Sequence, residues 1–358
     1  MSWVYELTKI FKIMKKIYQL PAVLVTILII LGILRFNVLT IKDVGENSAQ
    51  SGEKKSLNVG YLPVTCHLTC PVTDFASKSS SSTTIFKSQR FSDFPTVVSA
   101  LQTKKIQASF MLAPLAMKMK EDGLPIKICY LGHRDGSELI VDKFSKAKNL
   151  RDMVGKKIAI PSFYSNQHFV LLKLLEKQGL AENAINFIPL PPPDMPTALA
   201  TGAIDGFFVG EPFCAKAEIE NIGRVLYFAR DIWPDFISCV LVVHEDLIKE
   251  QPKVVKDLVK GIAESGAWAQ LHRKEAAKLA AVYYRQDPRI LNYVLTSSPR
   301  RVSYVKLKPS EQELQEIADV GLKMGFLKKK IEMSTLLDVS FVPEHILPAD
   351  IKLDKSMQ

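Results

Sequence analysis

The residues best able to do chemistry lie in one short segment. "TCHLTC", Thr65 to Cys70, places two cysteines around His67, directly after the strand-like run "LNVGYLPV". Thiols and an imidazole could bind a metal, form a disulfide, or serve as nucleophile and base. With the threonine hydroxyls they could also line a pocket for a small ligand. The spacing of the other cysteines and the predicted compartment help to choose among these possibilities.

Metal binding and catalysis are the less favoured uses of this segment. A structural zinc site needs about four ligands, whereas the segment supplies at most three and Cys129, Cys214 and Cys239 are isolated in the sequence. Copper(I) is disfavoured for the same reason. On an extended strand, the adjacent Cys66 and His67 point to opposite faces, which suits proton transfer poorly. We therefore predict no metal, no cofactor, no catalytic residue and no enzymatic activity.

A disulfide between Cys66 and Cys70 stays open at this stage. It requires an oxidising compartment and Cα atoms within about 7 Å of each other. Alternatively, His67 and the threonine hydroxyls make polar contacts to a ligand, and the cysteines form part of the pocket wall. The five cysteines leave at least one unpaired within the chain.

The N-terminus predicts the compartment. "LPAVLVTILIILGIL" (Leu20 to Leu34) is apolar, and with its flanks it reaches the ~20 residues that cross a bilayer. Lysines at 9, 12, 15 and 16 precede it, which keeps residues 1–19 cytoplasmic. A cleaved signal peptide is disfavoured because no A-x-A-like cleavage site follows the apolar run. A lipoprotein signal is disfavoured because no cysteine follows the run directly; the first cysteine is Cys66. We predict a single-pass signal-anchor at 20–39 in the inner membrane, with the body on the periplasmic side.

The segments around the body are polar, and the net charge is basic. Residues 40–56 predict a flexible tether, and residues 343–358 a C-terminal tail without strong pattern. The formal charge of +10 is not accompanied by a phosphate loop, zinc-finger spacing or aromatic RNA-binding motif. The charge therefore indicates a solvated basic surface, and we predict no nucleic-acid partner.

The body alternates strand-like and helix-like segments, which predicts parallel α/β units. "IQASFMLA" and "PIKICYLG" are typical of strands, and "SNQHFVLLKLLEKQGL" is typical of an amphipathic helix. The serine run of the low-complexity stretch "ASKSSSSTTIFKSQR" predicts an exposed loop. Connecting strands near 137–142 and 237–243 separate two units. We therefore predict one lobe from 57–137 plus 238–342, and a second from 138–237, with a cleft between them.

Several phrases resemble a known family. "NVGYLPV", "LRDMVGKKIAIP", "ALATGAIDGFFVGEPF" and "PKVVKDLVKGIAESGAWA" are similar to substrate-binding proteins of ABC importers, in the group that captures nitrate, sulfonates, taurine or bicarbonate. The resemblance implies a two-lobed type II periplasmic-binding fold with two hinge crossovers, here preceded by a transmembrane helix. It also implies a monomer that captures a small, anionic solute and delivers it to permease and ATPase subunits. "TCHLTC" departs from the family pattern.

Two other functions stay open. One is an enzyme on the same fold, related to thiamine-pyrimidine synthesis, and the other is a sensory ectodomain for a membrane partner. In such folds ligands lie at the carboxyl ends of strands, facing helix N-termini that favour anions. The predicted ligand-binding residues at these places are Thr65, Cys66, His67, Thr96, Ala113, Pro114, Ser162, Tyr164, Ser165, Asn166 and Glu211. Ser162 and Ser165 could instead be helix caps, and Glu211 suits an anion only if the ligand also carries a cationic or hydrogen-donating group.

Overall fold

The computed structural model describes residues 55–79, 84–298 and 301–353. The chain divides into the units Met1–Glu53 and Lys54–Gln358, and the described residues all belong to the second. The predicted cytoplasmic segment, the 20–39 signal-anchor and most of the 40–56 tether lie outside the described residues. Within the described ranges, no helix is both long and apolar enough to span a bilayer.

Two five-stranded sheets form the body, in the orders β2-β1-β3-β11-β4 and β10-β6-β9-β7-β8. The strands of the first sheet are β1 (Lys55–Tyr61), β2 (Thr84–Arg90), β3 (Ala108–Met111), β4 (Ile126–Leu131) and β11 (Val240–His244). Those of the second are β6 (Ser137–Asp142), β7 (Lys157–Ile160), β8 (Asn186–Pro189), β9 (Gly206–Gly210) and β10 (Gly223–Phe228). A two-stranded ribbon, β5 (Arg134–Asp135) with β12 (Val302–Ser303), lies beside them.

The first sheet is mixed rather than purely parallel. β1 pairs in parallel with β2 and β3, as expected for strands joined by crossover helices. β11 returns from the second lobe and inserts antiparallel between β3 and β4. All residues of β3 and of β11 are buried, which explains why both read as continuous apolar runs.

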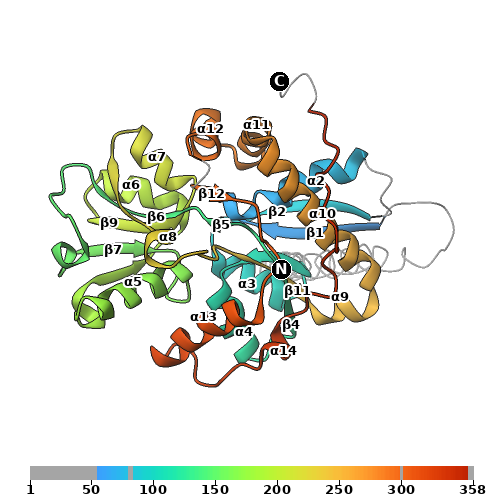
Figure 1. Cartoon of the computed structure of the whole chain (residues 1–358), viewed down its shortest axis with the longest axis horizontal. Coiled ribbons are helices and arrows are strands. Elements are labelled where there is room, and N and C mark those ends of the chain that lie inside the picture. Colours follow the sequence, from blue (N-terminus) through green and yellow to red (C-terminus); the bar gives the residue numbers. More distant parts are fainter. Residues whose placement is uncertain (1–54, 80–83, 299–300, 354–358) are drawn as a thin grey trace, which may run out of the picture. The chain divides into compact units, whose positions relative to one another are not determined.

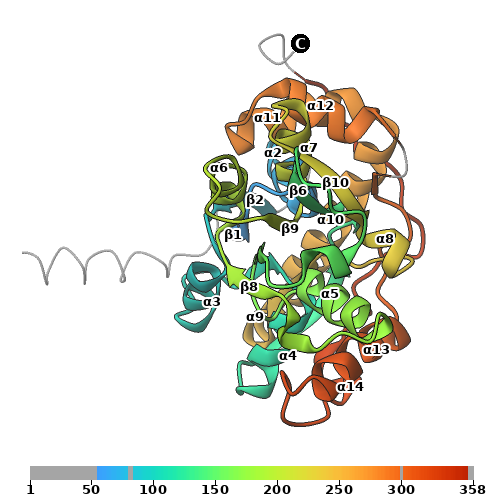
Figure 2. The same cartoon turned by 90° about the vertical axis from the view of Figure 1, so that its left-hand side faces the viewer.

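The helices before β6 and after β11 are α2 (Thr69–Ser79), α3 (Phe94–Gln102), α4 (Ala113–Glu121), α9 (Glu245–Glu250), α10 (Pro252–Leu271), α11 (Arg273–Tyr284), α12 (Pro288–Thr296), α13 (Glu311–Lys323) and α14 (Met333–Leu336). Those between β6 and β11 are α5 (Asn166–Lys177), α6 (Met195–Ala200), α7 (Phe213–Ile219) and α8 (Ala229–Ile232). Short 3₁₀ turns are η1 (Thr65–His67), η2 (Leu150–Met153), η3 (Glu182–Ala184) and η4 (Pro192–Asp194). Figure 1 shows α6 and α7 on one side of the second sheet and α5 on the other. α11 and α12 lie side by side (Figure 2).

Local signals explain the best-predicted helix, α5. Ser165 caps it by accepting a hydrogen bond from the His168 N–H at 3.1 Å. Apolar residues at helical spacing, among them Leu171, Leu174 and Leu175, are buried in one core cluster with strand residues of the second sheet. Gly179 follows the helix with φ +66°, a conformation that glycine adopts without a steric cost.

One local prediction was wrong, and another falls outside the described residues. "TCHLTC" is not an extended strand, because it forms η1 and the first residues of α2. The loop predicted for the serine run falls mostly on residues 80–83, outside the described residues, while the flanks of "ASKSSSSTTIFKSQR" form the end of α2 and all of β2. β2 lies at the edge of the sheet, where one face stays polar, so its sequence resembles a loop. α2 is held by packing against α10 and β2.

Two crossovers connect the sheets. The first runs from β4 through β5 into β6, and the second from β10 and α8 into β11. They lie against each other, since the Asp135 N–H donates to the Phe236 carbonyl at 2.9 Å and the Ser238 N–H to the His133 carbonyl at 3.4 Å. The assignment of residues to lobes at 57–137, 138–237 and 238–342 stays a prediction.

Candidate functional site

Three helix starts converge on the crossovers. η1 and α2 follow β1, α5 follows β7, and α7 follows β9, each at the carboxyl end of its strand. A direct backbone contact joins the two lobes here: the Thr65 N–H donates to the Glu211 carbonyl at 2.7 Å. Thr65 and Glu211, both predicted from the sequence as ligand-binding residues, are thus in direct backbone contact.

The 3₁₀ turn changes the relation between Cys66 and His67. Because they are not on an extended strand, they do not point to opposite faces. A ring nitrogen of His67 and the sulfurs of Cys66 and Cys239 lie within 4.8 Å of one another. The geometric reason given above against interaction of this cysteine with this histidine was therefore wrong.

His67 is fully buried and its tautomer follows from its contacts. Its Nδ1 accepts a hydrogen bond from the Leu62 N–H at 2.7 Å, so the ring proton of the neutral form resides on Nε2. Nε2 has no hydrogen-bond partner among the described residues. The ring stacks on Phe110, with centroids 5.4 Å apart. His67 therefore presents a fixed, buried N–H donor.

His133 is a second buried imidazole at the first crossover. Its Nε2 lies 2.9 Å from the Thr65 hydroxyl, and Tyr304 packs against the ring edge-on. Nδ1 lacks a partner within the described ranges. Burial lowers the pKa of His133 to about 4, so the ring is neutral at physiological pH.

Polar side chains from α5 and the second crossover complete the arrangement. The Asn166 amide donates to the Ile237 carbonyl, and the Gln167 amide donates to the Ser137 hydroxyl at 3.0 Å. Their amide oxygens, and the hydroxyl of Ser238, are buried without a hydrogen-bond partner in the described chain. We call His67, His133, Asn166, Gln167 and Ser238 the interlobe polar cluster.

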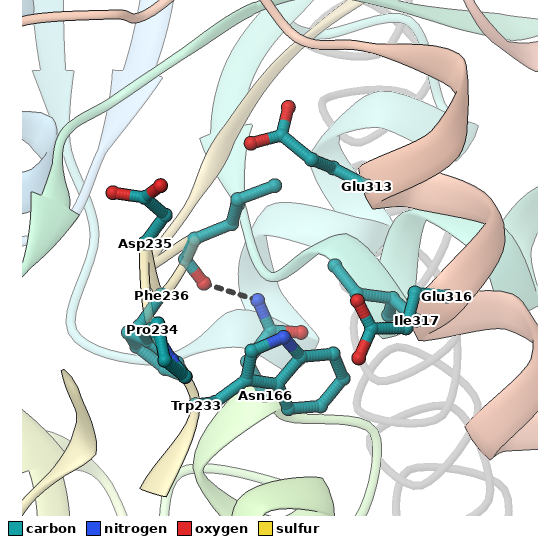
Figure 3. A pocket seen from close by; sticks show the side chains of 9 residues that line it. Asn166, Trp233, Pro234, Asp235, Phe236, Glu313, Glu316 and Ile317 are labelled. Carbon is teal, nitrogen blue, oxygen red and sulfur yellow. Dashed lines mark hydrogen bonds between the residues drawn. The ribbon is translucent and has the colours of Figure 1, made fainter. Parts of the chain in front are cut away.

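A cavity of about 170 Å³ adjoins this cluster at Asn166 (Figure 3). Trp233 and Phe236 from the second crossover line one side, while Glu313 and Glu316 project from α13 on the other. Glu313 pairs with Arg134 at 2.7 Å, and Glu316 with Lys173 at 3.0 Å. The full lining is Asn166, Trp233, Pro234, Asp235, Phe236, Ile237, Glu313, Glu316 and Ile317.

A buried acidic cluster lies beside α7. Arg301 hydrogen-bonds Glu211 and Glu218, and its Nε is 3.9 Å from Glu138. Burial raises the pKa of Glu138 well above its ordinary value, and the nearby Glu211 raises it further. The Glu211 carboxylate also accepts from the Ala215 N–H at 2.8 Å. The Glu211 carboxylate, which was predicted to contact the ligand, is thus bound by Arg301 and by the Ala215 N–H.

The other predicted residues are distributed more widely. Thr96 is exposed, and both its N–H and its hydroxyl donate to Asp93, the cap of α3. Ser162 accepts from the Tyr164 N–H at 3.0 Å, and the ring of Tyr164 packs edge-on against Phe326. Ala113 and Pro114 are buried in the first turn of α4. Ser165 has the capping role considered for it.

The described cysteines are all free thiols. The structure therefore differs from the Cys66–Cys70 disulfide considered above. The sulfur nearest Cys66 belongs to Cys239, at 3.0 Å, while the Cys70 thiol donates to the Val59 carbonyl at 3.7 Å.

Several residues of the site were missed by sequence reasoning. Gln167 and Ser238 were not singled out, and Arg301 carries no motif. The signal available for Gln167 was its place in the first turn of a helix that follows a strand end. Arg301 and Cys239 had none, because their partners are 90 and 173 residues away.

Within the described residues, two groups of side chains have the types that bind metals. They are Cys66, His67 and Cys239, and Glu138, Glu211 and Cys214, each with ligand atoms within 4.8 Å. In the second group Glu211 is already paired with Arg301. The polar cluster, by contrast, offers neutral hydrogen-bond donors and acceptors from both sides of the crossovers, which suits reversible binding of a small polar molecule.

Comparison with known proteins was consistent with this geometry. Residues 50–283 match the NMT1-like family. The taurine-binding periplasmic protein of Escherichia coli (strain K12) is 30% identical over 181 residues, which cover 49% of this chain and 55% of that protein. The chain thus matches about half the length of this relative.

Solved structures support the fold. The periplasmic nitrate-binding protein NrtA from Synechocystis PCC 6803 superposes with a TM-score of 0.74 at 14% identity, covering 81% of this chain and 87% of that one. A zinc-bound ligand-binding component of an ABC-type import system from Staphylococcus aureus gives a TM-score of 0.73 at 23% identity, covering 81% of this chain and 98% of that one. The prediction of a two-lobed, periplasmic-binding-protein-like α/β fold is confirmed.

Proposed function

The chain belongs to the NMT1-like family, and from this premise we propose that it is the solute-binding component of an ABC importer. It captures a small, singly charged anion between its lobes and releases it unchanged. The likeness to a taurine-binding protein and to a nitrate-binding structure supports this class of solute.

The observation that carries the proposal is the interlobe polar cluster. Buried polar atoms in proteins nearly always have a hydrogen-bond partner, and leaving one without costs about 1–3 kcal/mol. Here five side chains from both lobes and both crossovers each carry such an atom. A bound solute or water that supplies the partners removes this cost, which favours binding at this place.

The donors present define the solute. His67 Nε2–H and the Ser238 hydroxyl can donate to an anionic oxygen, and the Asn166 oxygen can accept from a hydrogen-bond donor. Three arginines near the crossovers are already paired: Arg134 with Glu313, Arg230 with Asp135, and Arg301 with the buried glutamates. Neutral donors and helix N-termini favour a single charge over a double one. Nitrate, bicarbonate and alkanesulfonates satisfy this description. Taurine is a zwitterion that presents the same singly charged sulfonate, and its ammonium group could donate to the Asn166 oxygen.

Among the residues predicted from sequence, we assign different roles. Thr65, His67 and Asn166 are proposed contacts of the solute, whereas the Cys66 sulfur lies against Cys239. Glu211 is a positioning residue, because its carbonyl holds the Thr65 N–H and its carboxylate holds Arg301. Ser165 orients the start of α5 as its cap.

Isothermal titration of the purified chain with nitrate, bicarbonate, taurine and a short alkanesulfonate tests the proposal. The informative variant is His67→Asn, whose side-chain oxygen can still accept from the Leu62 N–H while the Nε2 donor is removed. We expect saturable binding of one of these solutes, weakened at least tenfold in this variant. His244→Asn is the control, because His244 is a buried cap of α9 outside the cluster.

Melting curves give an independent measure. A solute present at 100 times its dissociation constant stabilises the folded chain by about 2.7 kcal/mol. Binding of no solute of this class, or equal binding by the wild type and His67→Asn, would contradict the assignment of the cluster as the site.

We further propose that residues 20–39 anchor the chain in the inner membrane, with the body facing the periplasm and a permease and an ATPase as partners. The apolar run and the preceding lysines support this. Carbonate extraction of membranes tests the anchor. The full chain is expected to stay in the membrane pellet, and its recovery in the wash would refute the anchor.

A further inference from the structure

The closest contact between two thiols in the described chain joins segments that are far apart in sequence. Cys66 lies in η1, and Cys239 lies in the second crossover, directly before β11. Their sulfurs are 3.0 Å apart, and the side chains are 2% and 1% exposed. A disulfide requires an S–S length of about 2.05 Å. The sulfurs therefore need to approach each other by only about 1 Å.

Gly132 permits this contact. A Cβ atom at this position would lie 2.0 Å from the Cys66 carbonyl oxygen, so only glycine allows the backbone of η1 to approach so closely. The Gly132 N–H in turn donates to the Cys239 carbonyl at 2.8 Å. One glycine at the end of β4 thus holds both cysteine backbones, and the pair is a fixed feature of the fold.

The two thiols differ in acidity. Burial alone would raise the pKa of Cys66, but the hydrogen bond with Cys239 and the neighbouring His67 lower it well below its ordinary value. Burial and the same hydrogen bond raise the pKa of Cys239. A thiolate beside a thiol is the pair that exchanges with a disulfide, because the thiolate is the attacking species.

Metal binding by the same residues is less well supported. The Leu62 N–H donates to His67 Nδ1, which occupies that lone pair. Nε2 carries the proton in the neutral ring, so it could bind a metal only after a tautomer change that breaks this hydrogen bond. Tetrahedral zinc with Zn–S of about 2.3 Å would also need the sulfurs to move apart rather than together.

We propose that Cys66 and Cys239 are a disulfide-forming pair that links the first turn after β1 to the second crossover. The Cys66 thiolate attacks a disulfide RSSR, forming a mixed disulfide and releasing RS⁻, which takes up a proton. The Cys239 thiol then loses its proton and attacks the Cys66 sulfur, which releases the second RSH. In sum, two protein thiols are oxidised to one disulfide, and RSSR is reduced to two RSH.

A Cys66–Cys239 disulfide would limit the movement of η1 relative to the second crossover. Thr65 and Ser238 are the chain neighbours of the two cysteines, and both crossovers pass this point. Oxidation therefore ties η1 to the segment through which the second lobe is connected. This consequence does not depend on the identity of the solute.

Thiol counting after treatment with oxidised glutathione tests the proposal. The reduced full chain is oxidised in its folded state and, in a second arm, during refolding from denaturant, because burial of both sulfurs slows access in the first. We expect the thiol count to fall by two from the five of the reduced chain, with Cys66 and Cys239 peptides joined in a non-reducing digest.

Matched variants separate this pair from the others. Cys239→Ser is expected to prevent the loss of two thiols, and Cys129→Ser, another buried cysteine, is expected to leave it intact. If Cys239→Ser folds poorly, the non-reducing peptide map of the wild type still shows whether Cys66 and Cys239 are joined. Five free thiols in both arms, a Cys66–Cys70 bond, a glutathione adduct that persists on Cys66, or a metal retained by the reduced protein would each overturn the proposal.

Discussion

Replacing Arg301 by glutamine should destabilise the protein strongly and in a pH-dependent way. Arg301 is 6% exposed and hydrogen-bonds Glu211, which is fully buried, as well as Glu218. At about 4 Å and an effective dielectric constant of about 20, each such attraction amounts to about 4 kcal/mol. Removing one partner of a buried ion pair costs about 3–5 kcal/mol, because the other charge remains in the interior. We expect a loss of this size at pH 7.5.

The dependence on pH follows from the carboxyl groups left behind. Burial raises the pKa of Glu211 and of Glu138, and Arg301 opposes this shift in both. Without Arg301 their folded-state pKa values rise further above the unfolded values. The folded variant then holds protons that the unfolded chain releases, so its stability falls as pH rises through this interval. The loss should therefore be smaller at pH 5 than at pH 7.5.

Urea unfolding followed by circular dichroism at both pH values measures the effect. Arg289→Gln is the control: it removes an arginine paired with Asp287 at the surface, and it should leave the midpoint unchanged. Adding Glu211→Gln to Arg301→Gln should recover part of the loss, because the buried charge is removed. A loss below about 1 kcal/mol for Arg301→Gln, or a loss that does not shrink at pH 5, would refute this account of the cluster.

Three further changes test other parts of the structure. Gly132→Ala should destabilise the chain by about 3 kcal/mol, because its Cβ would meet the Cys66 carbonyl, whereas Gly266→Ala, with a nearest contact of 3.4 Å, should be tolerated in thermal melts. Asp93→Ala should lower the free energy of unfolding by about 1 kcal/mol at pH 7, because α3 loses its cap. The loss should be smaller below pH 4, since capping lowers the pKa of Asp93 and its protonated form caps less well. Urea titrations at both pH values measure this. The pKa of His133 is about 4 in the folded chain and about 6.5 in the unfolded chain. The unfolded chain therefore binds a proton first as the pH drops below about 6.5, and the free energy of unfolding falls. His133→Gln should reduce this dependence on pH.

Local sequence determined much of the secondary structure. The cap at Ser165, the apolar spacing of α5 and the following Gly179 act within a few residues, so they could be read directly. Ser310 and Glu313 likewise form a capping box at the start of α13. The strand runs of β3 and β9 followed from their continuous apolar residues. Short-range hydrogen bonding and side-chain periodicity suffice for such elements.

The tertiary structure alone decided the mixed sheet and the residues that meet at the crossovers. β11 inserts between β3 and β4 although more than one hundred residues separate it from either strand, and nothing in its own apolar run specifies that register. Cys66 meets Cys239, and Arg301 meets Glu211, for the same reason. Such contacts depend on the summed packing of both lobes rather than on any local preference. The family resemblance supplied the two-lobed plan, while the polar cluster required the three-dimensional arrangement.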